Sequence, residues 1–173
     1  MVRRKKTKIA VLVLSGIILA ISLFTHVFPL HSIGIGKDSE LMPRLVYHFF
    51  HANIVHASIN AWCLMSLAFI YNISAYELFL AYAIASSYPI DFFCSVFGDE
   101  IAAMPTVGMS GICFAIMGQV AFRVVRKLYY NSCVCAIIAV GLFFPNANTL
   151  LHLYCYVIGL VPGFLNSPMP HAE

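Results

Sequence analysis

Charged residues are scarce in this chain of 173 residues, since Asp, Glu, Lys and Arg together make up only 10%. An ordinary soluble domain contains roughly 25% charged residues. Hydrophobic residues make up 61%, so too little polar surface remains to cover a water-facing protein of this size. This deficit excludes a soluble enzyme, a disordered regulator and a secreted disulfide scaffold. We therefore expect a polytopic membrane protein in a lipid bilayer, with no nucleic acid among its partners.

Metal-binding and redox motifs are also missing. The cysteines form no C-x-x-C pair and mostly fall inside apolar runs, which is typical of small core residues. His51 and His56 are five residues apart, which would place them about 140° from each other on a helix. No carboxylate completes a His-Glu-x-x-His motif with them. The sequence therefore disfavours a metal site.

Six long apolar segments make up most of the chain. They cover residues 9–28, 49–71, 75–90, 107–122, 128–144 and 150–165. Several are shorter than the roughly 20 residues that cross a typical bilayer, which indicates helices packed inside a bundle or a locally thinned bilayer. The expected fold class is an all-α membrane protein with six transmembrane helices.

The first apolar segment follows a basic stretch, as in a signal peptide. At about 20 residues it is longer than the apolar core of such a peptide, and no clear small-x-small cleavage site follows. We interpret it as a retained span. The expected organisation is a basic N-terminus (residues 1–8), a membrane domain (9–165) and a short tail (166–173).

The distribution of basic residues predicts the orientation of the segments. If the N-terminus is cytoplasmic, the loops at residues 29–44, 91–106 and 145–149 lie outside and contain two of the ten Lys and Arg residues. Cytoplasmic segments of membrane proteins carry the excess of Lys and Arg. Both termini are therefore expected in the cytoplasm. The second, fourth and sixth segments then all enter the membrane from the outside.

Polar side chains occur near the outer ends of these three segments, where burial in lipid makes them costly and marks them as functional candidates. They are His51, His56 and Asn60 in the second segment, Ser110 within the run Gly108-Met109-Ser110-Gly111 in the fourth, and His152 in the sixth. Because the segments enter from the same side, these residues lie at a similar depth. Packing alone does not explain such a gathering.

The residue types suit acyl transfer. A serine hydroxyl becomes a strong nucleophile when a general base removes its proton, and histidine is the usual base. We therefore predict Ser110 as the nucleophile and His152 as the base. A Ser-His dyad is the simpler interpretation, since a triad needs an acid from the loop at residues 91–106. The candidate acids there are Asp91, Asp99 and Glu100.

Acyl transfer also needs hydrogen-bond donors for the developing oxyanion. His56 and Asn60 are four residues apart and share one face of a helix. Both can donate, as can the backbone N–H of Ser110 near the start of its helix. These three donors are the predicted oxyanion hole.

Small residues form stripes on the fourth and sixth segments. Gly111, Ala115 and Gly118 share one face, and Gly159 and Gly163 form a G-x-x-x-G motif. Such stripes let helix backbones approach closely in lipid. We expect the two stripes to face each other, which would bring Ser110 and His152 together.

Three motifs occur in a characteristic order. They are His51-x4-His56-x3-Asn60, the run Gly108-Met109-Ser110-Gly111-Ile112-Cys113-Phe114-Ala115-Ile116-Met117-Gly118, and His152 with Gly159 seven residues later. Together they resemble the rhomboid family of intramembrane serine proteases, over nearly the whole chain from Ile9 to about Leu165. The resemblance implies a rhomboid-like bundle of six transmembrane helices with both termini cytoplasmic.

The resemblance also implies roles for individual residues. The implied catalytic residues are Ser110 and His152, with no acidic third member. The implied oxyanion hole consists of His56, Asn60 and the Ser110 amide. The implied supporting residues are His51, Gly108, Gly111 and Phe114.

Rhomboids cleave transmembrane or membrane-adjacent segments of other membrane proteins, with no cofactor or metal. The resemblance implies a site that water reaches from the non-cytoplasmic side. In a bacterium, this would be a multi-pass protein of the inner or plasma membrane, and its oligomeric state stays open.

The chain departs from the family pattern at three places. Phe114 stands where many members have a Tyr stacked on the catalytic histidine, and Cys155 stands where many have a Gly. The Trp-Arg pair of the first outside loop is missing. These departures concern loop anchoring and the fit between the fourth and sixth segments.

Three other functions are compatible with parts of this sequence. A catalytically silent rhomboid-like protein would bind membrane clients without cutting them, but such proteins normally lack the serine or the histidine. A small channel or transporter usually shows internal repeats and broken helices, and none is convincing here. A narrower alternative is a rhomboid relative dedicated to sorting signals at substrate C-termini, which the sequence leaves open.

Overall fold

The computed structural model describes residues 2–144 and 147–166, and within these ranges it contains helices and no strand. One isolated bridge pairs Ile35 with Thr106. The prediction of an all-α fold is confirmed for this part of the chain. Most of the predicted tail, residues 167–173, lies outside the described residues.

Six helices of ten or more residues correspond to the six apolar segments. They are α1 (Val2–Ser22), α4 (Ile54–Ile70), α5 (Ala75–Ser86), α7 (Ser110–Val120), α8 (Lys127–Gly141) and α9 (Thr149–Leu165). Short elements lie between them: η1 (Thr25–Val27), α2 (Leu30–Ile33), α3 (Leu41–Val46), η2 (Tyr47–Phe49), α6 (Ile90–Phe97) and η3 (Asp99–Ala102). Of the short elements, α2 and η3 lie within the loops expected outside, and α3 and α6 lie there for most of their length. η1 falls within the first apolar segment, and η2 ends at the first residue of the second.

Several helix boundaries differ from the sequence prediction. The basic stretch predicted as a separate N-terminus is part of α1, which begins at Val2. The helix of the second segment begins at Ile54 rather than residue 49, because the side chain of Asn53 caps it by accepting from the His56 backbone N–H at 2.8 Å. The assignment of His51 to this helix was therefore wrong. Likewise, Gly108 precedes α7, which begins at Ser110.

Among the described residues, no single helix combines the length and apolar composition of a membrane span. Two pairs of consecutive helical segments have sufficient length and apolar composition only when each pair is taken together. The segments Leu41–Phe49 and Ile54–Ile70 are bent by 84° at the break between them, and Ala75–Ser86 and Ile90–Phe97 are bent by 43°. The six-span topology therefore stays a prediction.

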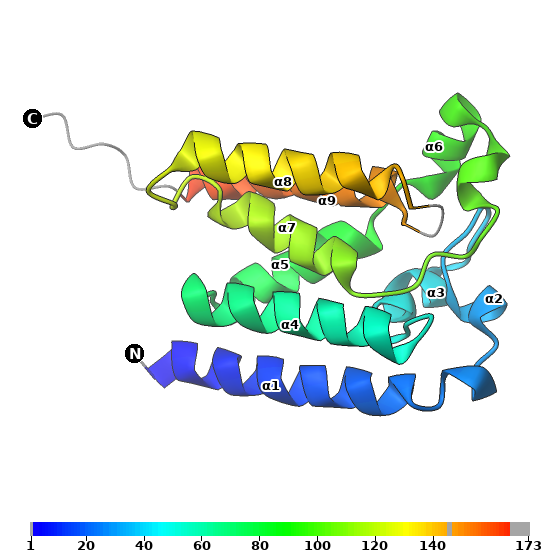
Figure 1. The fold of residues 1–173 in the computed structure, drawn as a ribbon, viewed down its shortest axis with the longest axis horizontal. Helices are drawn as coiled ribbons and strands as arrows, with labels where there is room; N and C mark the ends of the chain where they lie inside the picture. Colours follow the sequence, from blue (N-terminus) through cyan, green and yellow to red (C-terminus); the bar gives the residue numbers. More distant parts are fainter. Residues whose placement is uncertain (1, 145–146, 167–173) are drawn as a thin grey trace, which may run out of the picture.

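The long helices lie side by side with α7 in the interior of the bundle (Figure 1). Helix α7 packs most extensively against α9, and also against α5 and α4, while α1 covers α4 and α8 packs on α9. Figure 1 shows that α4, α7 and α9 all begin at the right-hand end, where α2, α3 and α6 gather. The start of α1 and the end of α9 lie at the opposite end.

Glycines allow α7 and α9 to touch through their backbones. A Cβ at Gly159 would overlap the carbonyl oxygen of Ala115, and one at Gly118 would overlap that of Tyr156. A Cβ at Gly163 would lie 2.6 Å from the Gly118 carbonyl oxygen. The prediction that the two small-residue stripes face each other is confirmed, and the close approach lets the helices pack over a long contact.

Ion pairs connect the region between α1 and α4 to the region between α5 and α7. Arg44 binds the Asp91 carboxylate at 2.6 Å and the Tyr88 carbonyl at 2.9 Å. Lys37 binds Asp99 at 2.7 Å, and this hydrogen bond and the carboxylate charge raise the pKa of Lys37 above its ordinary value. These contacts lie at the end of the bundle at which α4, α7 and α9 begin.

Candidate active site

Ser110 and His152 meet at the starts of two adjacent helices. Ser110 is the first residue of α7, and His152 lies in the first turn of α9. The Ser110 Oγ and the His152 Nε2 are 2.8 Å apart, within hydrogen-bonding distance. Both side chains are half-buried. This is the geometry that a histidine base needs in order to take the proton of a serine hydroxyl.

The ring of Phe114 supports the histidine. Phe114 lies one turn after Ser110 on α7 and is buried. Its ring stacks on the His152 imidazole with centroids 4.4 Å apart and an interplanar angle of 24°. The stacking restricts rotation of the imidazole, so that Nε2 stays directed at Ser110.

His56 and Asn60 lie against the backbone just before Ser110. A Cβ placed on Gly108 would lie 2.9 Å from the His56 ring and 3.5 Å from the Asn60 Nδ2. Gly108 also has a φ of +118°, a conformation that side-chain-bearing residues rarely adopt. Glycine is therefore required at position 108 for two reasons. It allows the backbone turn into α7, and it leaves space for the side chains of His56 and Asn60.

His51 holds the same turn from outside the helix. It is fully buried, and its Nε2 accepts a hydrogen bond from the Met109 backbone N–H at 3.3 Å. Its ring packs edge-on against His56 with centroids 5.1 Å apart. His51 thus supports the loop that leads into Ser110, although its position differs from the predicted one.

A family model described as the rhomboid domain matches residues 38–168, which is three quarters of the chain and includes the Ser110 and His152 region. The chain belongs to the rhomboid family. Members of this family are embedded in membranes and are generally intramembrane serine proteases that act on membrane-protein substrates. No curated protein and no solved structure matches the chain.

This rhomboid accommodates Cys155 close to its serine helix. A Cβ at Gly111 would lie 3.3 Å from the Cys155 Sγ and 3.2 Å from the Ala85 Cβ. Gly111 therefore leaves room for the Cys155 side chain of the opposite helix.

The candidate acids for a third catalytic member have other partners or are exposed. Asp91 accepts hydrogen bonds from Arg44 at 2.6 Å and from the Asp38 backbone N–H at 2.7 Å. Asp99 binds Lys37, and Glu100 is exposed. These contacts favour a dyad over a triad in this rhomboid.

Metal ligands are not gathered in the part of the chain that the structure describes, where no group of three His, Cys, Asp or Glu side chains could hold an ion. His51 and His56 lie close together, but His51 Nε2 is occupied by the Met109 N–H. This geometry favours a structural role for His51, which binds the backbone just before Ser110, over metal ligation.

Three supporting residues were missed by the sequence analysis. The Tyr47 carbonyl accepts from the Gly108 N–H at 3.0 Å, and the Asn148 side chain caps α9 and donates to the Thr106 Oγ at 2.8 Å. An Asn directly before an apolar run is a known signal of a helix start, so Asn148 could have been found as a cap. Nothing in the sequence marks Tyr47 or Thr106.

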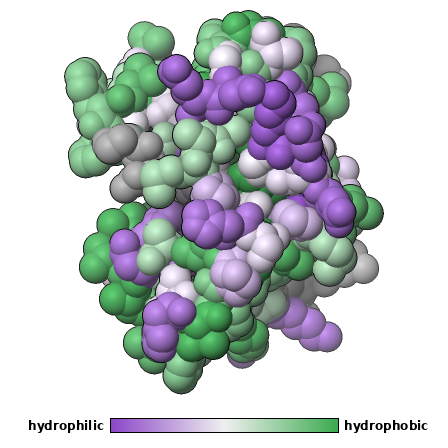
Figure 2. Space-filling model, turned by 90° about the vertical axis from the view of Figure 1, so that its right-hand side faces the viewer, coloured by the Kyte–Doolittle hydropathy of each residue, from purple (hydrophilic) through white to green (hydrophobic). Residues whose placement is uncertain are grey.

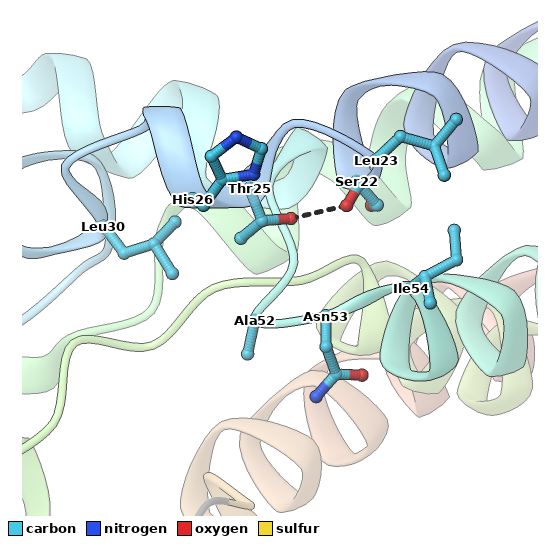
Figure 3. Close-up of a pocket in the computed structure, with 8 residues that line it drawn as sticks. All are labelled: Ser22, Leu23, Thr25, His26, Leu30, Ala52, Asn53 and Ile54. Carbon is cyan, nitrogen blue, oxygen red and sulfur yellow. Dashed lines mark hydrogen bonds between the residues drawn. The ribbon is translucent and has the colours of Figure 1, made fainter.

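Figure 2 looks onto the end of the bundle that carries the site, where hydrophilic residues gather across the face and hydrophobic residues flank them. A hollow of about 520 Å³ opens here between the end of α1 and the start of α4 (Figure 3). It is lined by Ser22, Leu23, Thr25, His26, Leu30, Ala52, Asn53 and Ile54. The hollow lies beside the cap of the helix that carries His56 and Asn60, and neither dyad residue lines it.

Proposed function

We propose that this protein is an intramembrane serine protease that cleaves transmembrane or membrane-adjacent segments of other membrane proteins. The observation that carries the proposal is the 2.8 Å distance between the Ser110 Oγ and the His152 Nε2, at the starts of two helices held together by glycine contacts. Membership of the rhomboid family supports it.

In the proposed reaction, the Ser110 Oγ attacks the carbonyl carbon of the scissile peptide bond while His152 Nε2 accepts the hydroxyl proton. The tetrahedral intermediate collapses when the imidazolium gives this proton to the leaving amine nitrogen. The acyl-enzyme ester is then hydrolysed by a water molecule, with His152 acting again as base and then acid. No net proton is taken up, and no metal or cofactor takes part.

His56, Asn60 and the Ser110 backbone N–H are proposed to stabilise the oxyanion. The first two side chains converge on Gly108, two residues before Ser110. The Asn60 Nδ2 bonds to the His56 carbonyl at 3.2 Å, which leaves its second hydrogen for the intermediate. At the N-terminus of α7, the free N–H groups also favour negative charge.

The topology is proposed from the charge distribution and the helix directions. The end of the bundle at which α4, α7 and α9 begin would face the non-cytoplasmic side, and both termini would be cytoplasmic. The opposite end contains the basic turn with Arg123, Arg126 and Lys127. In a bacterium the protein would lie in the inner or plasma membrane, with water entering the site from outside.

The proposal is tested by fluorophosphonate labelling of the detergent-solubilised protein. The wild type is expected to be labelled, and Ser110→Ala and His152→Ala are each expected to abolish labelling, because the first removes the nucleophile and the second its base. Ser86→Ala is a matched control, since the Ser86 Oγ also contacts a histidine, His48, at 3.0 Å. This control should label like the wild type.

Absence of labelling from a folded wild type would contradict the proposal and favour a silent rhomboid that binds membrane clients. Labelling lost in Ser86→Ala but kept in Ser110→Ala would move the nucleophile to the other Ser-His pair.

Replacement of Asn60 by Ala tests the oxyanion hole. We expect turnover of a membrane-protein substrate to fall by about 10²- to 10³-fold, which is typical for the loss of one oxyanion donor. Labelling of Ser110 should persist, although more slowly, because nucleophile and base are intact. Asn131→Ala is the control, since its amide nitrogen donates to the Lys127 carbonyl and its amide oxygen accepts from the Tyr156 hydroxyl, both away from Ser110 and His152. Full activity of Asn60→Ala would remove Asn60 from this role.

A further inference from the structure

Two polar residues outside the dyad occupy equivalent places before it. Thr106 lies four residues before Ser110, and Asn148 lies four residues before His152. The Asn148 Nδ2 donates a hydrogen bond to the Thr106 Oγ at 2.8 Å. This bond joins the segment that leads into α7 to the segment that leads into α9.

The orientation of the Asn148 amide is determined by its neighbours. Its Oδ1 accepts from the Leu151 backbone N–H at 2.9 Å, and its backbone carbonyl accepts from the His152 N–H at 3.2 Å. A backbone N–H can only donate, so the amide oxygen must face Leu151 and the amide nitrogen must face Thr106. Asn148 therefore caps the helix of the base and binds the serine's loop with one side chain.

Thr106 offers a firmly held attachment point. Its backbone N–H donates to the Ile35 carbonyl at 2.8 Å, and its carbonyl accepts from the Ile35 N–H at 3.0 Å. Two residues on, the Gly108 N–H donates to the Tyr47 carbonyl at 3.0 Å. The approach to Ser110 is thus anchored on one side by backbone bonds, and Asn148 ties α9 to it from the other.

Helix packing alone constrains this end of α9 less tightly. The backbone contacts at Gly118 and Gly159 lie about two turns beyond the dyad. Nearer the site, Gly111 faces the side chains of Leu151 and Cys155, which can yield. A small tilt about the distant contacts would therefore change the Ser110–His152 distance.

We propose that the Asn148–Thr106 hydrogen bond is the element that holds His152 in reach of Ser110, and that both residues are positioning residues. The inference rests on the proposed protease function. Neither side chain touches the reacting atoms, so the effect of each is through the geometry of the dyad. A misplacement of about 1 Å costs on the order of 10²-fold in rate.

Two variants break the bond in different ways. Thr106→Val keeps the shape of the side chain and removes the hydroxyl. Asn148→Ser keeps a residue that caps helices well but is too short to reach Thr106. Each is expected to lower the rate of fluorophosphonate labelling by about tenfold or more, with nearly unchanged thermal midpoints. Asn148→Ser also removes the Oδ1 that accepts from the Tyr88 hydroxyl at 3.4 Å. The double variant should label no more slowly than Asn148→Ser, because the bond that Thr106→Val removes is already lost in that variant.

Conservative and matched variants separate positioning from general stability. Thr106→Ser keeps the hydroxyl and should label within about threefold of the wild type, as expected for a retained interaction. Thr149→Val removes a buried hydroxyl on the same turn of α9 that has no hydrogen-bond partner in the described structure, and it should leave labelling unchanged. If Asn148→Ser does not fold, the comparison of Thr106→Val with Thr106→Ser still tests whether the Thr106 hydroxyl positions His152.

The outcomes distinguish this inference from the proposed function. A labelled wild type with Thr106→Val at the same rate would overturn the inference alone, as would additive losses in the double variant. Equal slowing in Thr106→Ser and Thr106→Val would show that the hydroxyl is not the cause, and would also overturn it. An unlabelled, folded wild type would overturn the protease function and the inference with it.

Discussion

Replacement of His152 by Ala is expected to lower substrate cleavage by roughly 10⁴- to 10⁶-fold, as in other serine proteases that lose their base. The Ser110 hydroxyl would stay protonated, because His152 Nε2 is the group that lies 2.8 Å from its Oγ. Ser110→Ala should cause a loss of the same size. The measurement is kcat on a purified transmembrane substrate in detergent or in liposomes.

The double variant Ser110→Ala with His152→Ala makes this prediction sharper. Residues that act as a unit lose their joint contribution when either is removed, so the double variant should be no slower than the single variants. A loss equal to the product of the two would show independent roles and contradict the dyad. His26→Ala is the control, because His26 is an exposed histidine that lines the hollow beside the α4 cap.

Thermal stability separates chemistry from folding in these variants. His152→Ala removes the ring that stacks on Phe114, so a small decrease of the melting midpoint is expected. Ser110→Ala should melt like the wild type. A His152→Ala protein that is unfolded at the assay temperature would leave Ser110→Ala to carry the prediction. In cells, a client whose lifetime is unchanged by Ser110→Ala would point to a non-catalytic function.

Replacement of Gly118 by Leu is expected to destabilise the bundle strongly and to abolish activity. A single Cβ there would already overlap the Tyr156 carbonyl oxygen and lie 2.8 Å from the backbone of Gly159 and Leu160. Overpacking of this kind typically costs about 1–3 kcal/mol of the free energy of unfolding, occasionally more. Because backbone atoms cannot rotate away, α7 and α9 must move apart, and Ser110 and His152 with them.

Gly16→Ala provides the matched control for the Gly118 variant. Gly16 lies inside α1, and a Cβ there would meet no atom within 4 Å. Replacement by Ala should therefore stabilise the helix by about 1 kcal/mol. Gly118→Ala should already lower the melting midpoint, and Gly118→Leu should lower it further. Equal melting of Gly118→Leu and the wild type would contradict the close-packing argument.

The positions of the long helices could be predicted because apolar segments in this chain are separated by polar or proline-containing breaks. The helix start at Ile54 was missed, since the cap at Asn53 lies inside the apolar segment and is evident only from its bond to the His56 N–H. α5 ends at Ser86, earlier than the apolar run, because Pro89 follows and disfavours helix in the residue before it.

The candidate site was predictable to a similar extent. The shared direction of three segments predicts that their polar residues lie at one level, and Figure 1 shows α4, α7 and α9 beginning at the same end. The parts that were missed are backbone contacts. The Tyr47 carbonyl and the Ile35 backbone act without any requirement on side-chain identity, so no residue pattern announces them.

The sequence by itself determined that this is a helical chain with a membrane protein's composition, and it singled out the serine, histidines and asparagine that are proposed to carry the chemistry. Composition and motif spacing contain this information because they depend on residue type. Only the tertiary structure decided that Ser110 and His152 meet, that Gly108 leaves room for His56 and Asn60, and that Asn148 binds Thr106. These contacts join residues 42 or more positions apart, and distances across the bundle depend on how closely its helices pack.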